Sequence, residues 1–275
     1  MSQSAATFPA LTSTQTTSTL LPVFSLWRRE IVRFYRQKSR VIGVILSPLL
    51  FWLVIGSGFG SSFRSSGSDQ HYLQYFYPGS LLMIVLFTSI FTMMSVIEDR
   101  DRGFLSSVLV APVSRSAIVM GKVLGGTTLS AAQGLVFLVF APAVGAHFSV
   151  EGVLIDVVSV FLMAFSLTAL GFALAWRMES AQAFHAVVNL FLIPLWILSG
   201  ALFPVNGASG WIRWVMRFNP LTYGLDALRS ALYPASATSN LFSVGTSLAI
   251  LAIFTAAIFA LAFMMVNRRT TQPAA

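Results

Sequence analysis

The chain has 275 residues, of which 56% are hydrophobic and only 9% are charged, and its mean hydropathy is +0.79. A soluble domain carries about 25% charged residues, so this composition excludes an ordinary soluble domain and indicates one embedded in lipid. The sequence has no cysteine, which excludes disulfides, thiolate metal sites and a cysteine nucleophile. A net charge of +8 would also suit a nucleic-acid binder, but in a membrane chain it indicates cytoplasmic loops rich in Lys and Arg.

Residues 1–21 are rich in Ser, Thr, Ala and Gln, contain no Lys or Arg, and have no apolar core typical of a signal peptide. We expect a disordered cytoplasmic tail there. From Pro22 to Arg40, apolar and basic residues recur at helical spacing and predict an amphipathic helix on the membrane surface. Its interfacial residues are Trp27, Arg29, Arg33, Tyr35 and Arg36, whose Arg side chains can reach lipid phosphates. The alternative is a solvated helix that packs on another domain.

Six apolar stretches of spanning length follow, at approximately 41–60, 78–97, 124–147, 153–176, 186–203 and 244–266. Unpaired backbone groups are too costly in lipid for open strands, and the alternating pattern of barrel strands is missing. The predicted fold class is therefore an all-α integral membrane protein, with one transmembrane domain over residues 22–268 and a cytoplasmic tail over 269–275. We expect six transmembrane helices preceded by the amphipathic helix.

The distribution of Lys and Arg predicts the orientation. With the N-terminus inside, thirteen of these residues fall on the cytoplasmic side and four on the other, so both termini are predicted to be cytoplasmic. One outer segment contains Trp211, Trp214 and Phe218 and is interpreted as a short interfacial helix.

The spans contain few groups for chemistry. Asp156 lies near the outer end of its span and is interpreted as a rim residue, so a proton- or sodium-coupled secondary transporter is disfavoured. Ser199 and His185 are about 21 Å apart along a helix, which argues against an intramembrane serine protease. His71 and His147 have no metal-ligand spacing. Because no Walker-type glycine loop occurs, we expect no cofactor on this chain and an energy source on a partner.

One cytoplasmic segment is unusual for its charge. Five consecutive charged residues at 98–102 follow an apolar span and are succeeded by Gly103 and a short predicted helix that ends before Pro112. The apolar side of this helix is formed by Phe104, Leu105, Val108 and Leu109. Such a helix either lies on the membrane or inserts into a groove of another protein.

This segment resembles the cytoplasmic loop of the ABC-2 family of ABC transporter permeases, in which a charged run ending in Gly precedes a coupling helix. A Pro-x-Ser-Arg turn at 112–115 and Gly121-Lys122 continue the resemblance. A second similar segment follows the fifth span and comprises Phe203-Pro204-Val205, Trp211 and residues 219–229. The resemblance covers residues 22–268 and is nearest to drug-exporter permeases of the daunorubicin-resistance type. Phe104 and Ser106 stand where many relatives have Thr and Glu.

The resemblance implies a multi-pass permease of the cell membrane. It would work with a second copy of itself and a separate P-loop ATPase that holds ATP and magnesium, without nucleic acid. The residues implied in ATPase coupling are Glu98, Asp99, Arg100, Gly103, Phe104, Leu105, Pro112 and Arg115. Those of the outer family segment are Asn219, Pro220, Tyr223, Asp226 and Arg229.

The resemblance also implies a substrate path along the second and fifth spans. Its candidate residues are Phe87, Phe91, Met94, Asn189 and Trp196, although each suits helix packing or lipid contact equally well. An apolar path favours a hydrophobic or amphiphilic cargo, drug or lipid-like. The alternatives are a permease for a lipid-linked oligosaccharide or polysaccharide, a secondary transporter, and a membrane anchor that transports nothing.

Overall fold

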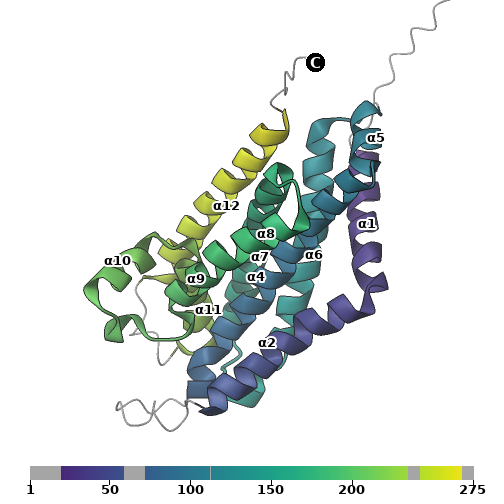
Figure 1. Cartoon of the computed structure of the whole chain (residues 1–275). Coiled ribbons are helices and arrows are strands. Elements are labelled where there is room, and N and C mark those ends of the chain that lie inside the picture. Colours follow the sequence, from purple (N-terminus) through teal and green to yellow (C-terminus); the bar gives the residue numbers. More distant parts are fainter. Residues whose placement is uncertain (1–19, 59–71, 112, 235–241, 268–275) are drawn as a thin grey trace, which may run out of the picture.

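The computed structural model of the chain describes residues 20–58, 72–111, 113–234 and 242–267 (Figure 1). The regular structure in these ranges is entirely helical, which confirms the all-α part of the predicted fold class. Most of the predicted N-terminal tail, the C-terminal tail at 269–275, His71 and Pro112 lie outside the described residues. Leu20 and Leu21, placed in that tail by the sequence, belong to the first helix instead.

The amphipathic segment forms helix α1 (Leu20–Arg36) and is separated by Gln37 from α2 (Lys38–Gly58). Helix α1 runs beside α6 (Arg115–Leu138) of the same chain (Figure 1). Its apolar positions Leu26 and Phe34 are buried, as the helical spacing requires. The helix therefore packs on the bundle of its own chain.

Among the described residues, five helical segments are long and apolar enough to cross a membrane. They are the Val41–Gly58 part of α2, α4 (Tyr72–Asp101), α7 (Val150–Arg177), the irregular segment Ala181–Ala201, and α12 (Val244–Asn267). The remaining expected span, at 124–147, corresponds to α6, which packs against α4 and α7 but is less apolar than the others. Five of the six expected spans thus satisfy the length and hydropathy criteria.

The glycines of α6 sit where other helices come close. A Cβ atom on Gly121 would lie 2.6 Å from a carbon of Leu26, and one on Gly125 would lie 2.8 Å from Glu30, both on α1. On the opposite side, a Cβ on Gly126 would lie 2.6 Å from Thr168 of α7. Small residues at such contacts let membrane helices approach closely. Helix α6 is therefore an interior helix, clamped between α1 and α7.

The expected helix at 124–147 differs from the structure at both ends. Helix α6 begins at Arg115 and ends at Leu138, and the chain continues as the 3₁₀ turn η1 (Ala141–Val144). Pro142 lies inside this turn, and Gly145 has a φ of +76°, a conformation that favours glycine. Pro142 therefore belongs to the connection that follows the helix and does not kink a span.

The fifth span is irregular. It consists of α8 (Ala181–Val187), the π-helical turn η2 (Val188–Leu192), α9 (Ile193–Trp196) and a second π-helical turn, η3 (Ile197–Ala201). Pro194 removes a backbone donor from the middle of this segment, and Gly200 has a φ of +89°. The chain then forms η4 (Val205–Gly207), α10 (Gly210–Phe218) and α11 (Pro220–Leu232).

Two short helices complete the fold. The predicted coupling helix is α5 (Phe104–Val110), at the end of the bundle where α12 terminates (Figure 1). The predicted interfacial helix is α10, and its residues Trp211, Trp214 and Phe218 are exposed.

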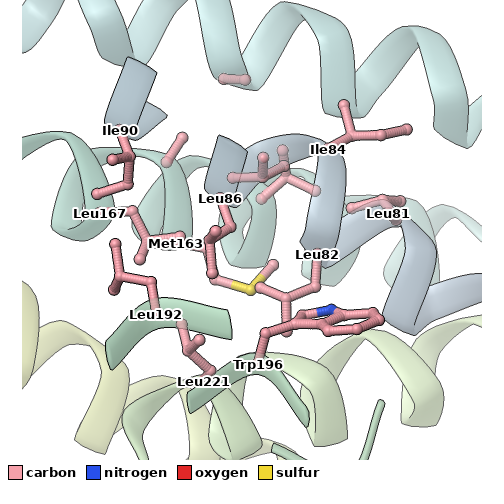
Figure 2. Packing of buried hydrophobic residues seen from close by; sticks show 14 of the residues in the cluster. Leu81, Leu82, Ile84, Leu86, Ile90, Met163, Leu167, Leu192, Trp196 and Leu221 are labelled. Carbon is pink, nitrogen blue, oxygen red and sulfur yellow. The ribbon is translucent and has the colours of Figure 1, made fainter. Parts of the chain in front are cut away.

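The main core is built around α4. Figure 2 shows its apolar residues packing against α7, the fifth span and α11; those labelled are Leu81, Leu82, Ile84, Leu86, Ile90, Met163, Leu167, Leu192, Trp196 and Leu221. Because most of α4 is buried among other helices, it is the central element of the bundle. A displacement of either of its ends would therefore be passed to the helices packed around it.

Candidate functional site

Helices α1, α4 and α6 meet at the end of the bundle beside α5, where their charged side chains form one network. The network comprises Arg29, Glu30, Arg33, Glu98, Asp99 and Lys122. Three cations thus face three carboxylates.

Asp99 is the centre of the network, and its side chain is fully buried. The Arg29 guanidinium donates two hydrogen bonds of 2.7 Å to its two carboxylate oxygens. Arg33 donates one bond of 2.8 Å to Asp99 and one of 2.6 Å to Glu98. Paired guanidinium bonds of this kind fix orientation as well as charge. They attach α1 to the last turn of α4.

Lys122 carries the network to α6. Its Nζ donates to Glu30 at 2.6 Å, to the Ser95 hydroxyl at 3.1 Å, and to Asp99. Lys122 is 1% exposed and Glu30 is 2% exposed, so neither charge has access to water in compensation. Buried charges persist only when they are paired and hydrogen-bonded. The ammonium of Lys122 therefore holds α1, α4 and α6 in one register.

Arg29 also links the network to the coupling helix. Its guanidinium lies 3.6 Å from the ring centroid of Phe104, a cation–π contact. The hydrogen bond to Asp99 raises the pKa of Arg29, so this side chain is charged at every physiological pH. Leu105 packs in a small apolar cluster with Leu26 of α1 and Ile118 of α6. Helix α5 is thus fixed to the same three helices that share the charges.

The remaining coupling residues connect the site to other spans. Arg100 donates bonds of 2.6 Å to the carbonyls of Trp176 and Met178, at the end of α7. Gly103 has a φ of +73°, which turns the chain sharply between α4 and α5. Arg115 donates to the carbonyl of Val266 at the end of α12, at 3.3 Å. The predicted coupling residues in the described ranges therefore gather at one end of the bundle.

The outer family segment lies away from the charge network, mainly on α11. Asn219 caps α11 by accepting from the backbone N–H of Leu221, and it donates to the carbonyl of Leu195 at 2.6 Å. Arg229 donates to the carbonyl of Gly200 at 2.7 Å. The other members of the segment are Pro220, at the first helical position of α11, and Tyr223 and Asp226, both buried. These contacts hold α11 against the fifth span.

The structure brings together only some of the candidate path residues. The rings of Phe87 and Phe91 stack with centroids 5.5 Å apart, and both line a hollow of about 210 Å³ between α2 and α4. Met94 is partly buried on α4, and Asn189 is exposed on the fifth span. Trp196 is buried and donates to the carbonyl of Gly79 at 2.9 Å, so it faces the core and not this hollow.

The burial of Asp156 differs from what its interpretation as a rim residue requires. It is 1% exposed, and among the described residues its Oδ1 has no hydrogen-bond partner. A rim position requires access to the outer surface, which α11, packed on this helix, denies to Asp156. The carboxyl is instead buried inside the bundle.

The sequence matches the family described as ABC-2 type transporter over residues 22–233. The chain belongs to this family. It is 31% identical over 245 residues to the putative transport permease ycf38 of Cyanophora paradoxa, with 84% of each chain covered. It is 25% identical over 232 residues to the daunorubicin resistance ABC transporter permease protein DrrB1 of Streptomyces coeruleorubidus, covering 82% of this chain and 78% of the relative. It is 24% identical over 249 residues to nodulation protein J of Rhizobium meliloti (strain 1021), covering 89% and 92%.

This ABC-2 permease is therefore the transmembrane subunit of an ABC exporter and a multi-pass membrane protein. The family is one of permease subunits, which are not themselves ATPases and which pair with an ATP-binding subunit. The predicted coupling loop, on which the family resemblance was partly based, contains Asp99 of the charge network and Phe104, which contacts Arg29.

Sequence reasoning missed two members of the permease's network. Glu30 is the sole acid of the amphipathic helix, and Lys122 is the sole charge within the glycine-rich stretch of α6. A lone charge in an otherwise apolar or oppositely charged segment requires a partner, because its burial alone is costly. Opposite lone charges on two segments are the signal that identifies such a pair, although the sequence does not say which segments meet.

Proposed function

We propose that this permease works as two copies, each with six spans and cytoplasmic termini, and each docked on a separate P-loop ATPase that holds ATP and magnesium. The pair exports a hydrophobic or amphiphilic compound, drug or lipid-like, from the cell membrane. The charge network supports this proposal because it joins the exposed coupling helix rigidly to the spans. The excess of Lys and Arg on one side supports the orientation.

Helix α5 offers the surface that such a partner requires. Val110 is 88% exposed and Leu109 is 41% exposed, while Leu105 on the other side is anchored in the bundle. Exposed apolar residues that insert into a groove supply most of the energy of such contacts. The partner would hold the outward side of α5 while the inward side is fixed to α1, α4 and α6.

The contacts also define how motion would travel. A push on α5 reaches Arg29 through Phe104, and Arg29 is bonded to Asp99 at the end of α4. Because α4 is buried along its length and Arg100 ties it to α7, the two helices would move together as a rigid body. ATP-driven closure of two ATPases would in this way reorient the spans around a central path.

An apolar path suits the proposed cargo. The hollow at Phe87 and Phe91 has mostly apolar walls, and Met83 and Pro48 complete them. The relative from Streptomyces coeruleorubidus is named for daunorubicin resistance, which is consistent with a cargo of this class. Aromatic and methionine walls bind such compounds by contact area and need few polar groups.

The coupling assignment is tested with the full chain and its ATPase reconstituted in proteoliposomes. We expect Val110→Ala to lower cargo-stimulated ATPase activity several-fold, because it removes the most exposed apolar contact of α5. Val150→Ala is the matched control, since Val150 is 92% exposed at the start of α7, away from α5. Equal activities of the two variants would reject the assignment of α5.

The cargo is tested separately in the same vesicles. An anthracycline or a fluorescent phospholipid should move in an ATP-dependent manner, and Phe87→Ala should reduce the initial rate while ATPase docking is retained. Transport of a polysaccharide alone would reject the proposed cargo class, and transport driven by an ion gradient without ATP would reject the ABC mechanism.

A further inference from the structure

A basic hollow opens at the C-terminal end of α1, next to the turn between α4 and α5. Its volume is about 320 Å³, and it is lined by Arg29, Val32, Arg33, Arg36, Gln37 and Arg102. Four guanidinium groups therefore face one small space.

Within the described residues, the ion pairs of the protein do not balance all the charges of this hollow. Arg29 and Arg33, together with Lys122, are matched by the three carboxylates of the charge network. Arg36 and Arg102 are exposed, and within the described part of the chain neither forms an ion pair. Two positive charges are thus left over, at a place where two others already converge. Guanidinium groups in this arrangement select oxyanions, and phosphate above all, because their planar forks bind two oxygens at once.

The depth of the hollow indicates where the phosphate comes from. Arg36 precedes Val41, the first residue of the apolar part of α2, by five residues. Trp27 and Tyr35 on the same helix are residue types that favour the boundary between lipid and water. Tyr35 and Val41, which flank Arg36 in the sequence, line a separate hollow whose walls are mostly apolar residues of α2, α4 and α6. The basic hollow therefore lies at the level of lipid headgroups, with apolar surface nearby.

We propose that this hollow binds the phosphate of an anionic phospholipid, with Arg36 and Arg102 as its principal ligands and Arg29 and Arg33 as shared ones. On the topology proposed above, the lipid belongs to the cytoplasmic leaflet. Its phosphate removes the repulsion between the two unmatched guanidinium groups and adjoins the contacts that fix α1 to α4. The site is independent of the cargo, so it stands or falls separately from the proposed function.

The site is tested by native mass spectrometry of the full chain in detergent, titrated with phosphatidylglycerol, phosphatidylcholine or inorganic phosphate. We expect Arg36→Gln and Arg102→Gln each to weaken phosphatidylglycerol binding about five-fold, from about 1 kcal/mol for each Arg near an anionic surface. Their combination should weaken it about 25-fold, and Arg36→Lys should restore part of the affinity. Arg28→Gln is the matched control, because Arg28 is exposed on α1 but does not line the hollow.

Three results would overturn the proposal. Equal loss of affinity in Arg28→Gln would mean that the lipid responds to net charge alone. Inorganic phosphate binding as tightly as phosphatidylglycerol would assign the hollow to a soluble anion. Unchanged lipid binding together with weaker docking of the ATPase in Arg36→Gln would make the hollow a protein contact. Because Arg36 and Arg102 are both exposed, neither substitution should change the melting temperature. Measuring it verifies that the variants are folded.

Discussion

Replacing Lys122 by Met tests the charge network directly. Met has a similar length and fills the same space, but it leaves Glu30 without its ammonium partner and removes one of the three cations bonded to Asp99. Glu30 retains only Arg29, at 3.8 Å, while its side chain stays 1% exposed. Breaking a buried pair by removing one partner costs about 3–5 kcal/mol, because the other charge remains buried. We expect a loss of this size in the free energy of unfolding.

The double variant Lys122→Met, Glu30→Gln separates pairing from packing. It removes both partners, and Asp99 keeps its bonds to Arg29 and Arg33. The double variant should therefore be more stable than Lys122→Met alone. Together with Glu30→Gln alone, the cycle should give a coupling energy of at least about 1 kcal/mol, typical of residues in contact. Reversible unfolding of the purified permease in mixed micelles measures all four members of the cycle. Strict additivity, or a cost below about 1 kcal/mol for Lys122→Met, would refute the network as described.

Three further changes probe the bundle by the melting temperature of the purified permease. Gly126→Val should destabilise it by about 1–3 kcal/mol through overpacking against α7. Gly43→Ala, with no atom within 4 Å of the added Cβ, should be neutral or slightly stabilising. Equal effects of the two substitutions would contradict the close contact between α6 and α7. Asp156→Asn should leave the stability unchanged or raise it, since the carboxyl has no cationic partner in the described ranges, and a large loss would reveal one. Trp196→Phe should cost about 0.5–1.5 kcal/mol by removing the hydrogen bond from the indole N–H to the carbonyl of Gly79, and a cost near zero would argue against that bond.

Local patterns in the sequence predicted the amphipathic elements well. The spacing of apolar residues placed α1 and α10, and the Gly103 turn and Pro112 bounded α5 within a residue or two. These features depend on neighbours three or four residues apart, so they can be recognised in the sequence. The family resemblance rested on the same short segments, and the family match confirmed it.

Features that depend on distant contacts were harder to predict. Helix α6 was shifted by nine residues because Lys122, whose charge is buried and paired with Glu30 of α1, lowers the hydropathy of the stretch where α1 packs on it. Asp156 was taken for a rim residue because its burial depends on helices that pack on α7, among them α11, which follows more than 60 residues later. The two π-helical turns of the fifth span lie on either side of the short helix that contains Pro194, and no local pattern distinguishes them from a kinked helix.

The pairing of Glu30 with Lys122 also bears on how the chain is made. The two residues are 92 positions apart, and the ribosome produces Glu30 and Asp99 before their shared ammonium exists. Until α6 has entered the bilayer, Arg29 and Arg33 are the only network cations available to the acids of α1 and α4. The contacts of α1 with α6 therefore form after those of α1 with α4, and in a nascent chain that stops before α6 one of the three network carboxylates would lack its cation.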